Sequence, residues 1–217
     1  MKIKRVTLAL VAAAGLAGCT TVGAQLASSV QSMGWTLDTK GVPSGRYVLD
    51  PNHTSLLFKI SHLGYSLYVG RFDAIHGTIA YDHDHPEASK VLITVDPSSI
   101  DTNNPTLEMT LIGKSYFDVA AYPQATYAAS SITIKDDRHG TMNGDLTLHG
   151  VTRPVPLEVT FNGGANNTLT GKYTIGFTAS AEIKRSDFGI KTLIPLVGDQ
   201  VFLEINAEFA REGGKPE

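Results

Sequence analysis

Strict alternation of apolar and polar residues dominates the C-terminal half of this chain. Residues 155–161, 169–179 and 201–209 each read with a period of two, as "VPLEVTF", "LTGKYTIGFTA" and "VFLEINAEF". Successive side chains of a β-strand point to opposite faces, so this period predicts strands with one buried and one solvent-facing side. A helix needs apolar residues every three or four positions instead. The chain is therefore predicted to be an all-β protein.

Turn-forming stretches separate the predicted strands at short intervals. Examples are "DDRHG" at 136–140, "HGVTRP" at 149–154 and "NGG" at 162–164. About eight to ten strands at this spacing indicate an antiparallel sandwich or barrel. Two of the predicted strands, over 67–81 and 168–184, are long, which favours the barrel.

One short helix is expected to interrupt the strands. Asn104 is placed to cap it and Pro105 suits its first position. Leu107, Leu111 and Ile112 form its apolar stripe, and the helix is expected to end near residue 113.

The N-terminus reads as an export signal. A basic start, "MKIKR", precedes the apolar run "VTLALVAAAGLAG", which is too short to span a membrane. The run ends in "LAGC", which resembles the lipobox of bacterial lipoproteins, and Cys19 is the only cysteine of the chain. Cleavage after "VGA" at 22–24 is the alternative, but the order of signal, small residues and cysteine favours lipidation of Cys19. Thr20 beside it, in place of aspartate, favours an outer-membrane anchor facing the periplasm.

These assignments divide the chain into four parts. Residues 1–18 are the predicted signal peptide, 19–45 a small, polar tether, 46–211 a single β-domain and 212–217 a C-terminal tail. Loss of Lys2, Lys4 and Arg5 with the signal lowers the formal charge from −3 to −6. A mature chain with one cysteine has no internal disulfide, so its stability must come from its core.

The sequence offers few candidates for catalysis. Its mild negative charge without a basic cluster argues against nucleic acid binding, and no nucleotide-binding glycine loop, CxxC, HExxH, GxSxG or SxxK signature occurs. "YDHDHP" at 81–86 places His83 and His85 beside aspartates, and both residue types bind zinc or copper. Because Pro86 ends the strand and "KVLITVD" begins the next one at residue 90, a solvated turn is favoured over a metal site. We expect neither a metal nor a cofactor.

His53 and His62 mark the start and the end of one predicted strand. At nine residues apart they lie on opposite faces, about 30 Å from each other in an extended strand, so they are not expected to share a metal. Each either hydrogen-bonds at the mouth of a barrel or is a structural histidine with its partners satisfied.

Several blocks of the domain resemble, in order and spacing, the YceI-like family. They are "YVLDPNHTSLLFKISHLGYSLYVGRFDAIHGTI", "YFDVAAYPQATY", "GDLTLHGVTRPVPLEV" and "IKRSDFGIK", and the resemblance runs from Tyr47 to Phe209. It implies an exported protein with a lipocalin-like antiparallel barrel of about eight strands that binds a polyisoprenoid or another long amphiphilic lipid. The family has no established enzyme activity.

The same resemblance suggests where a ligand would lie. A barrel of about eight strands is either filled by side chains or holds one slender ligand. The predicted interior residues lie on the apolar faces of the two most regular strands, and they are Tyr173, Ile175, Phe177, Leu203 and Ile205. The strands run out into loops at "HLGYS" and "RSDFGIKTLIP", so the predicted rim residues are His62, Tyr65, Arg185 and Phe188. Arg185 either meets a phosphate there, or is solvated, or pairs with Asp187.

Three functions stay open from the sequence. The favoured one is a lipid-binding protein with a transport, storage or stress-related role, whose partners are a long-chain lipid and, through the anchor, a membrane. The second is a lipid-acting enzyme with His53 or His62 as general base. The third is an envelope interaction module without a small ligand. Dimerisation is left open as well.

Overall fold

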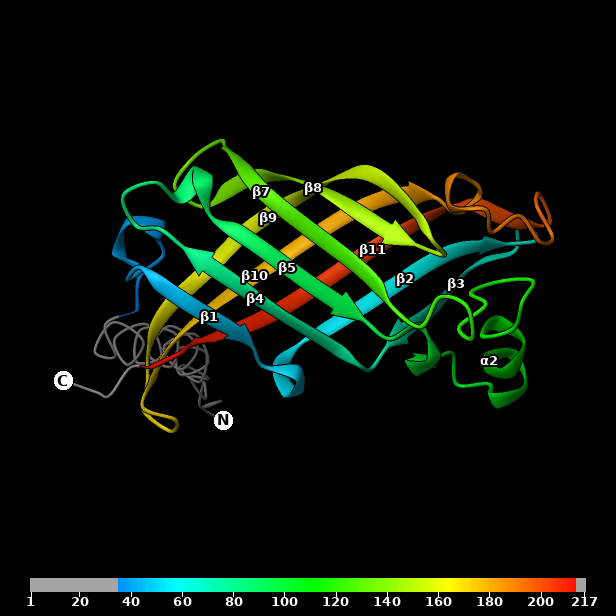
Figure 1. The fold of residues 1–217 in the computed structure, drawn as a ribbon, viewed down its shortest axis with the longest axis horizontal. Coiled ribbons are helices and arrows are strands. Elements are labelled where there is room, and N and C mark those ends of the chain that lie inside the picture. The colour runs from blue at the N-terminus through cyan, green and yellow to red at the C-terminus, as the bar shows by residue number, and fades with distance from the viewer. Residues whose placement is uncertain (1–34, 214–217) are drawn as a thin grey trace, which may run out of the picture.

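The computed structural model describes residues 35–213, which form one antiparallel β-structure (Figure 1). Its strands are β1 (Gly45–Leu49), β2 (Ser55–His62), β3 (Ser66–Phe72), β4 (Ile75–Tyr81), β5 (Lys90–Val95), β6 (Ile100–Asp101), β7 (Ala125–Ile134), β8 (His139–Leu148), β9 (Val151–Asn167), β10 (Lys172–Lys184) and β11 (Val197–Arg211). The predicted signal peptide, Cys19 and residues 214–217 of the predicted tail lie outside the described residues. Between residues 35 and 213, no helix is long and apolar enough to cross a membrane.

Eight of these strands close into a barrel. The sheet runs in the order β1-β4-β5-β7-β8-β9-β10-β11, and β11 pairs back with β1. Neighbouring strands are antiparallel all the way round, including the closing pair. Closure leaves no open sheet edge along this part of the wall. The predicted antiparallel lipocalin-like barrel is confirmed.

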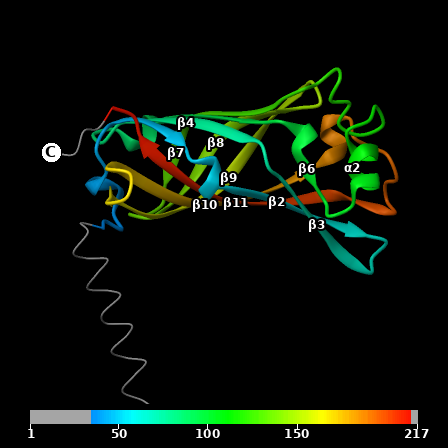
Figure 2. The same ribbon diagram turned by 90° about the horizontal axis from the view of Figure 1, so that it is seen from below.

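The remaining strands extend the wall at one end. β2 lies along β11 beyond the point where β1 stops, and the hairpin of β2 and β3 projects next to the helix (Figure 2). The single strand predicted over 67–81 is wrong, because the chain breaks between β3 and β4. There the backbone N–H groups of Asp73 and Ala74 donate to the carbonyl and the hydroxyl of Ser99, at 3.1 and 2.9 Å, instead of to a neighbouring strand.

The longest pairing joins β10 and β11. It runs from Thr174 opposite Ala210 to Lys184 opposite Gln200 without a register shift. The strand predicted to start at 168 starts at 172, because residues 168–171 form the turn from β9. Gly171 has a φ of 67°, a conformation that favours glycine, and Leu169 is consequently exposed at the tip.

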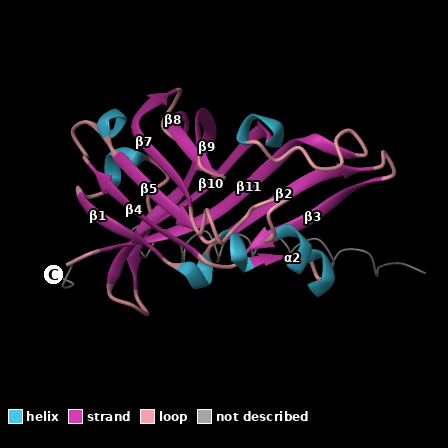
Figure 3. Ribbon diagram, turned by 45° about the vertical axis from the view of Figure 1, so that its right-hand side comes forward, coloured by secondary structure: helices cyan, strands magenta, loops and turns pink. Residues whose placement is uncertain are grey.

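The predicted helix is present as α2 (Pro105–Leu111), the one α-helix between residues 35 and 213. The Asn104 side chain caps it by accepting from the backbone N–H of Leu107 at 3.2 Å. Short 3₁₀ turns, like α2, lie where strands end (Figure 3). After α2, the chain packs Phe117 edge-on against Phe72, with ring centroids 5.7 Å apart, and so helps to fill this end of the barrel.

The other end is covered by residues 35–44, which we call the cap segment. It contains the 3₁₀ turn η1 (Thr39–Gly41), and its Val42 is only 2% exposed within the hydrophobic core. The tether predicted over 19–45 is therefore too long. The cap segment has no alternation that would signal burial, because it crosses the end of the barrel and pairs with the wall only where Thr36 meets Gly164 of β9.

Candidate functional site

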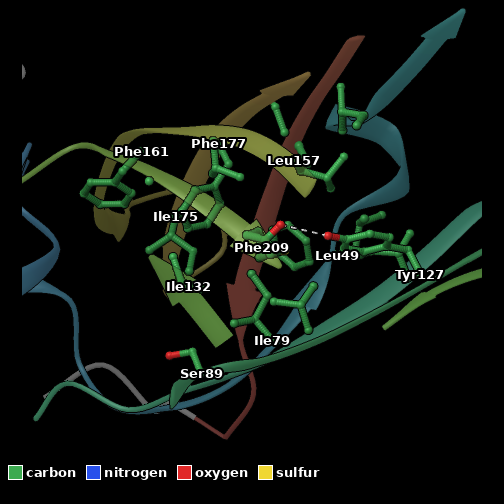
Figure 4. A pocket seen from close by; sticks show the side chains of 18 of the residues that line it. Leu49, Ile79, Ser89, Tyr127, Ile132, Leu157, Phe161, Ile175, Phe177 and Phe209 are labelled. Atoms are coloured by element: carbon green, nitrogen blue, oxygen red, sulfur yellow. Dashed lines mark hydrogen bonds between the residues drawn. The ribbon is translucent and has the colours of Figure 1, made fainter. Parts of the chain in front are cut away.

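The barrel encloses a cavity of about 220 Å³ (Figure 4). All eight strands of the barrel contribute inward-facing side chains to its wall, which include Leu49, Ile79, Ile132, Leu157 and Phe161. The alternation seen in the sequence places these apolar side chains inside and their polar neighbours outside. The wall is therefore suited to an apolar molecule.

The register of β10 and β11 explains why the interior is not completely filled. Phe177 pairs with Ala207, and Ala179 pairs with Ile205, so a large side chain faces a small one twice along the wall. The ring of Phe177 also lies edge-on to Phe209, with centroids 6.2 Å apart. The alanines leave space that two large side chains would occupy.

The main polar side chain in the wall is satisfied by the barrel itself. The Tyr127 hydroxyl donates to the carbonyl oxygens of Met142 and Val155, at 3.1 and 3.0 Å. Gly144 makes room for this ring, because a Cβ there would lie 2.5 Å from Tyr127 Cζ. Burial raises the pKa of Tyr127 to about 12, so the phenol is neutral at physiological pH.

Polar groups collect at one end of the cavity. This polar end is formed by the β7–β8 turn, the connection from β4 to β5 and the cap segment. Ser89 is buried there and its Oγ accepts from the backbone N–H of Asp82 at 3.3 Å. The backbone N–H of Arg138 and the side chain of His139 lower the pKa of Asp136, so this carboxylate stays charged. An apolar molecule with a polar group at one end fits this distribution.

Four of the five predicted interior residues lie on the cavity wall. They are Ile175, Phe177, Leu203 and Ile205. The fifth, Tyr173, is outside the cavity, and its hydroxyl donates to the carbonyl oxygen of Gly41 in the cap segment at 3.2 Å. The binding roles of these residues remain predictions.

The predicted rim residues lie at the end of the barrel opposite the polar end of the cavity. His62 pairs with Val197 at the start of β11, whereas the polar end of the cavity lies near the end of that strand. Tyr65 is 86% exposed in the turn between β2 and β3. Neither side chain lines the cavity.

Arg185 and Phe188 follow the end of β10 at the same end of the barrel, and both are buried. Arg185 is 6% exposed and Phe188 is 1% exposed. Arg185 donates to four backbone carbonyl oxygens, those of Gly198, Ile190, Thr192 and Val197. Four of its five N–H groups hold the 190–198 segment, so Arg185 is neither solvated nor bonded to the exposed Asp187. Its contact with a ligand phosphate stays a prediction.

None of the four histidines singled out in the sequence, His53, His62, His83 and His85, lines the cavity. His53 is exposed in the 3₁₀ turn η2 (Pro51–His53), where its Nδ1 lies 2.9 Å from an Asp50 carboxylate oxygen, and neither it nor His62 lines the cavity. "YDHDHP" forms the connection predicted from the sequence, and His83 Nδ1 lies 3.2 Å from the carbonyl oxygen of Val42. No group of three or more potential metal ligands occurs in the part of the chain that the structure describes.

Sequence reasoning missed the groups that form the polar end. Ser89 and Val42 lie before strands, where no alternation of apolar and polar residues indicates that they are buried. The aromatic residues Tyr47 and Tyr81 fit the strand alternation, but nothing local indicates that their hydroxyls reach the cap segment. The contact of Tyr81 with Thr39 spans 42 residues, and that of Tyr47 with Pro43, although only four residues long, belongs to no regular element.

Comparison with known proteins gives a consistent result. The family model described as YceI-like domain matches residues 47–209. Protein YceI of Escherichia coli O157:H7 is 39% identical over 156 residues, 72% of this chain and 81% of that protein. Among solved structures, the YCEI protein of Campylobacter jejuni superposes with a TM-score of 0.62 at 31% identity, over 71% of this chain and 91% of that one.

A more distant match extends the fold comparison. A polyisoprenoid binding domain from Saccharophagus degradans has a TM-score of 0.58 at 17% identity, covering 78% of this chain and 99% of that one. At this identity the match concerns the fold.

Proposed function

This chain belongs to the YceI-like family, and from that premise we propose that it binds the apolar chain of one amphiphilic lipid inside its barrel. A polyisoprenoid is the class we favour, because the barrel of the Saccharophagus degradans domain, named for binding that class, has the same fold. The protein would hold the lipid for transport or storage.

The observation that carries the proposal is the cavity of about 220 Å³ with an apolar wall and polar groups at one end. Burial of each methylene of a lipid chain contributes about 0.8 kcal/mol, so a short segment already binds appreciably. A cavity of about 150 Å³ lined by similar side chains admits benzene. The space present here therefore holds the leading segment of a long chain, and the remainder needs further side chains or the cap segment to move.

The polar groups suggest the orientation of the lipid. Its apolar tail points toward the interior residues Phe177 and Ile205, and its head group lies near Ser89 and the β7–β8 turn. This turn carries Asp136, Asp137 and Arg138, so the head group meets charges of both signs. The orientation is opposite to the one expected from the sequence.

Extraction of the purified protein with organic solvent tests the proposal. We expect mass spectrometry to find one class of long-chain lipid at close to one molecule per protein. Leu203→Trp narrows the cavity and should lose this lipid, whereas Phe202→Trp, next to it on the outer face of β11, should retain it. Absence of extracted lipid, together with failure to bind added farnesol, would contradict the proposal.

Export and anchoring through Cys19 are a second part of the proposal, supported by the sequence of the N-terminus. The protein would reside in the periplasm, attached to the outer membrane. Cys19→Ser should move it from the membrane fraction to the soluble fraction. A wild-type protein that is already soluble and begins at Gln25 would contradict this part and leave lipid binding unaffected.

A further inference from the structure

The cap segment covers the polar end of the cavity. Thr39 and Val42 both line the cavity, and Val42 is buried in the core. The segment precedes residue 47, where the family match begins. A lipid that enters at the polar end has to pass Val42.

Barrel side chains hold the backbone of the cap segment through its carbonyl oxygens. The Tyr81 hydroxyl donates to Thr39 at 2.8 Å, and the Tyr173 hydroxyl donates to Gly41 at 3.2 Å. Two more contacts reach the following carbonyls: His83 Nδ1 lies 3.2 Å from that of Val42, and the Tyr47 hydroxyl donates to that of Pro43 at 2.7 Å. The Ser44 carbonyl accepts from the Arg211 side chain at 2.7 Å, so five carbonyl groups in this short segment are engaged by side chains from the barrel and its β4–β5 connection.

The start of the cap segment is fixed to β9. Thr36 and Gly164 exchange two backbone hydrogen bonds, of 2.8 and 2.9 Å. The Trp35 indole covers Gly163, where a Cβ would lie 2.4 Å from the ring. Between these contacts and β1, the segment runs across the end of the barrel.

An ion pair reaches from the cap segment to the β7–β8 turn. Lys40 Nζ lies 3.5 Å from Asp137 Oδ1, and both side chains are exposed, at 76% and 70%. Asp137 also lines the cavity at its polar end. The pair therefore joins two of the three segments that form this end.

We propose that the cap segment is a lid on the cavity, which opens to admit the lipid and closes over it. The cap segment is attached mainly by single hydrogen bonds and one exposed ion pair, with Val42 as its buried apolar contact, whereas the barrel wall is a continuous ladder. Its contacts can therefore be released while the barrel stays folded. The proposal rests on the proposed lipid binding and adds the route of entry.

Removing two hydroxyl groups tests the lid. Tyr81→Phe with Tyr173→Phe deletes the hydrogen bonds to Thr39 and Gly41 but keeps both rings. Uptake of the apolar fluorescent probe diphenylhexatriene, followed by stopped flow, should accelerate by roughly two- to tenfold for each hydrogen bond lost. Tyr68→Phe is the matched control, because its hydroxyl donates to the Thr102 carbonyl at 3.0 Å, away from the cap segment. Equal rates in the double variant and the control would contradict the lid.

Fixing the cap segment in its closed position with a reversible cross-link gives the opposite test, in which uptake should slow down. In a Cys19→Ser background, Lys40→Cys and Asp137→Cys are joined by a bis-thiosulfonate cross-linker, which dithiothreitol removes. Locked protein should take up the probe at least about tenfold more slowly than reduced protein. The same cross-link at Lys59→Cys and Glu204→Cys, which replace an ion pair between β2 and β11, should not slow uptake. Unchanged uptake by the locked protein would mean that the lipid enters elsewhere.

Hydrogen exchange separates this proposal from the proposed function, because it needs no ligand. The backbone N–H groups of Gly41 and Val42, which bond to Asp38 and Thr39, should exchange much faster than those of β10, and faster still in the double variant. Protection equal to that of β10 would overturn the lid whether or not lipid binds. Failure of the wild-type protein to take up the probe or farnesol would count against lipid binding instead.

Discussion

The side chain of Arg185 donates from Nε to the carbonyl oxygen of Gly198 over 2.7 Å, which ties the end of β10 to the start of β11. Its other nitrogens bond to three more carbonyl oxygens of the 190–198 segment. A buried arginine whose guanidinium is occupied by backbone carbonyls organises a loop.

Replacement of Arg185 should consequently affect stability and not lipid selectivity. Arg185→Met leaves several carbonyl groups without a partner, and we expect a loss of about 3 kcal/mol or more in the free energy of unfolding. Lys184→Met, at the exposed neighbouring position, should change it by less than about 0.5 kcal/mol. Urea denaturation measures both. A stable Arg185→Met protein that loses its lipid would support the head-group role.

The strands of the barrel could be predicted from the sequence, because alternation is a local pattern. Closure pairs Tyr47 with Arg211 at the two ends of the domain, and only the family resemblance and the strand lengths favoured it. Ile175, Phe177 and Ile205 each lie in a strand whose period of two fixes the inward face before any tertiary contact is known. The break at residues 73–74 could not be predicted, since it depends on Ser99, which arrives from a later segment.

The polar end of the site escaped prediction for a related reason. "RSDFGIK" is polar in sequence and suggests an exposed rim, but burial of Arg185 requires carbonyl groups that only the folded 190–198 loop provides. The cap segment lacks periodicity, and its position depends on tyrosines up to 132 residues away, as for Tyr173 and Gly41. Such contacts leave no local signal.

Alkaline pH should destabilise the barrel through its buried phenols. Burial raises the pKa of Tyr127 from 10.0 to about 12. Between these values the unfolded chain has lost the phenolic proton while the native protein retains it, so stability falls as pH rises above 10. The fall amounts to about 1.4 kcal/mol per pH unit for one such group.

Tyr127→Phe provides the check. It should cost about 1 kcal/mol at pH 8, where one buried hydroxyl is removed. Its unfolding free energy, measured in urea from pH 8 to 11, should then decline less steeply above pH 10 than that of the wild type. Parallel curves would show that Tyr127 does not contribute to the alkaline loss.

Metal removal should leave the protein unchanged. His85 Nδ1 lies 3.4 Å from a Glu87 carboxylate oxygen and the His85 side chain is mainly exposed, which is the arrangement of a surface ion pair. We expect the melting temperature to be the same before and after treatment with a chelator. Stoichiometric zinc or copper in the purified protein, absent from the double variant His83→Ala with His85→Ala, would establish a metal site.

Filling the cavity from its smallest wall residues should separate an open barrel from a solid one. Ala207 is buried opposite Phe177 and lines the cavity, so Ala207→Leu adds three carbons to the empty space. If that space is present, the larger side chain fits, and the free energy of unfolding should stay within about 1 kcal/mol of the wild type while farnesol affinity falls. In a filled core the same change would overpack the interior and cost about 1–3 kcal/mol.

Ala210→Leu is the matched control on the opposite face of β11 and should keep farnesol affinity. Both variants are measured by unfolding in urea and by farnesol titration. A destabilised Ala207→Leu protein, together with a wild type that binds no farnesol, would show that the barrel is filled and lacks the cavity on which lipid binding depends.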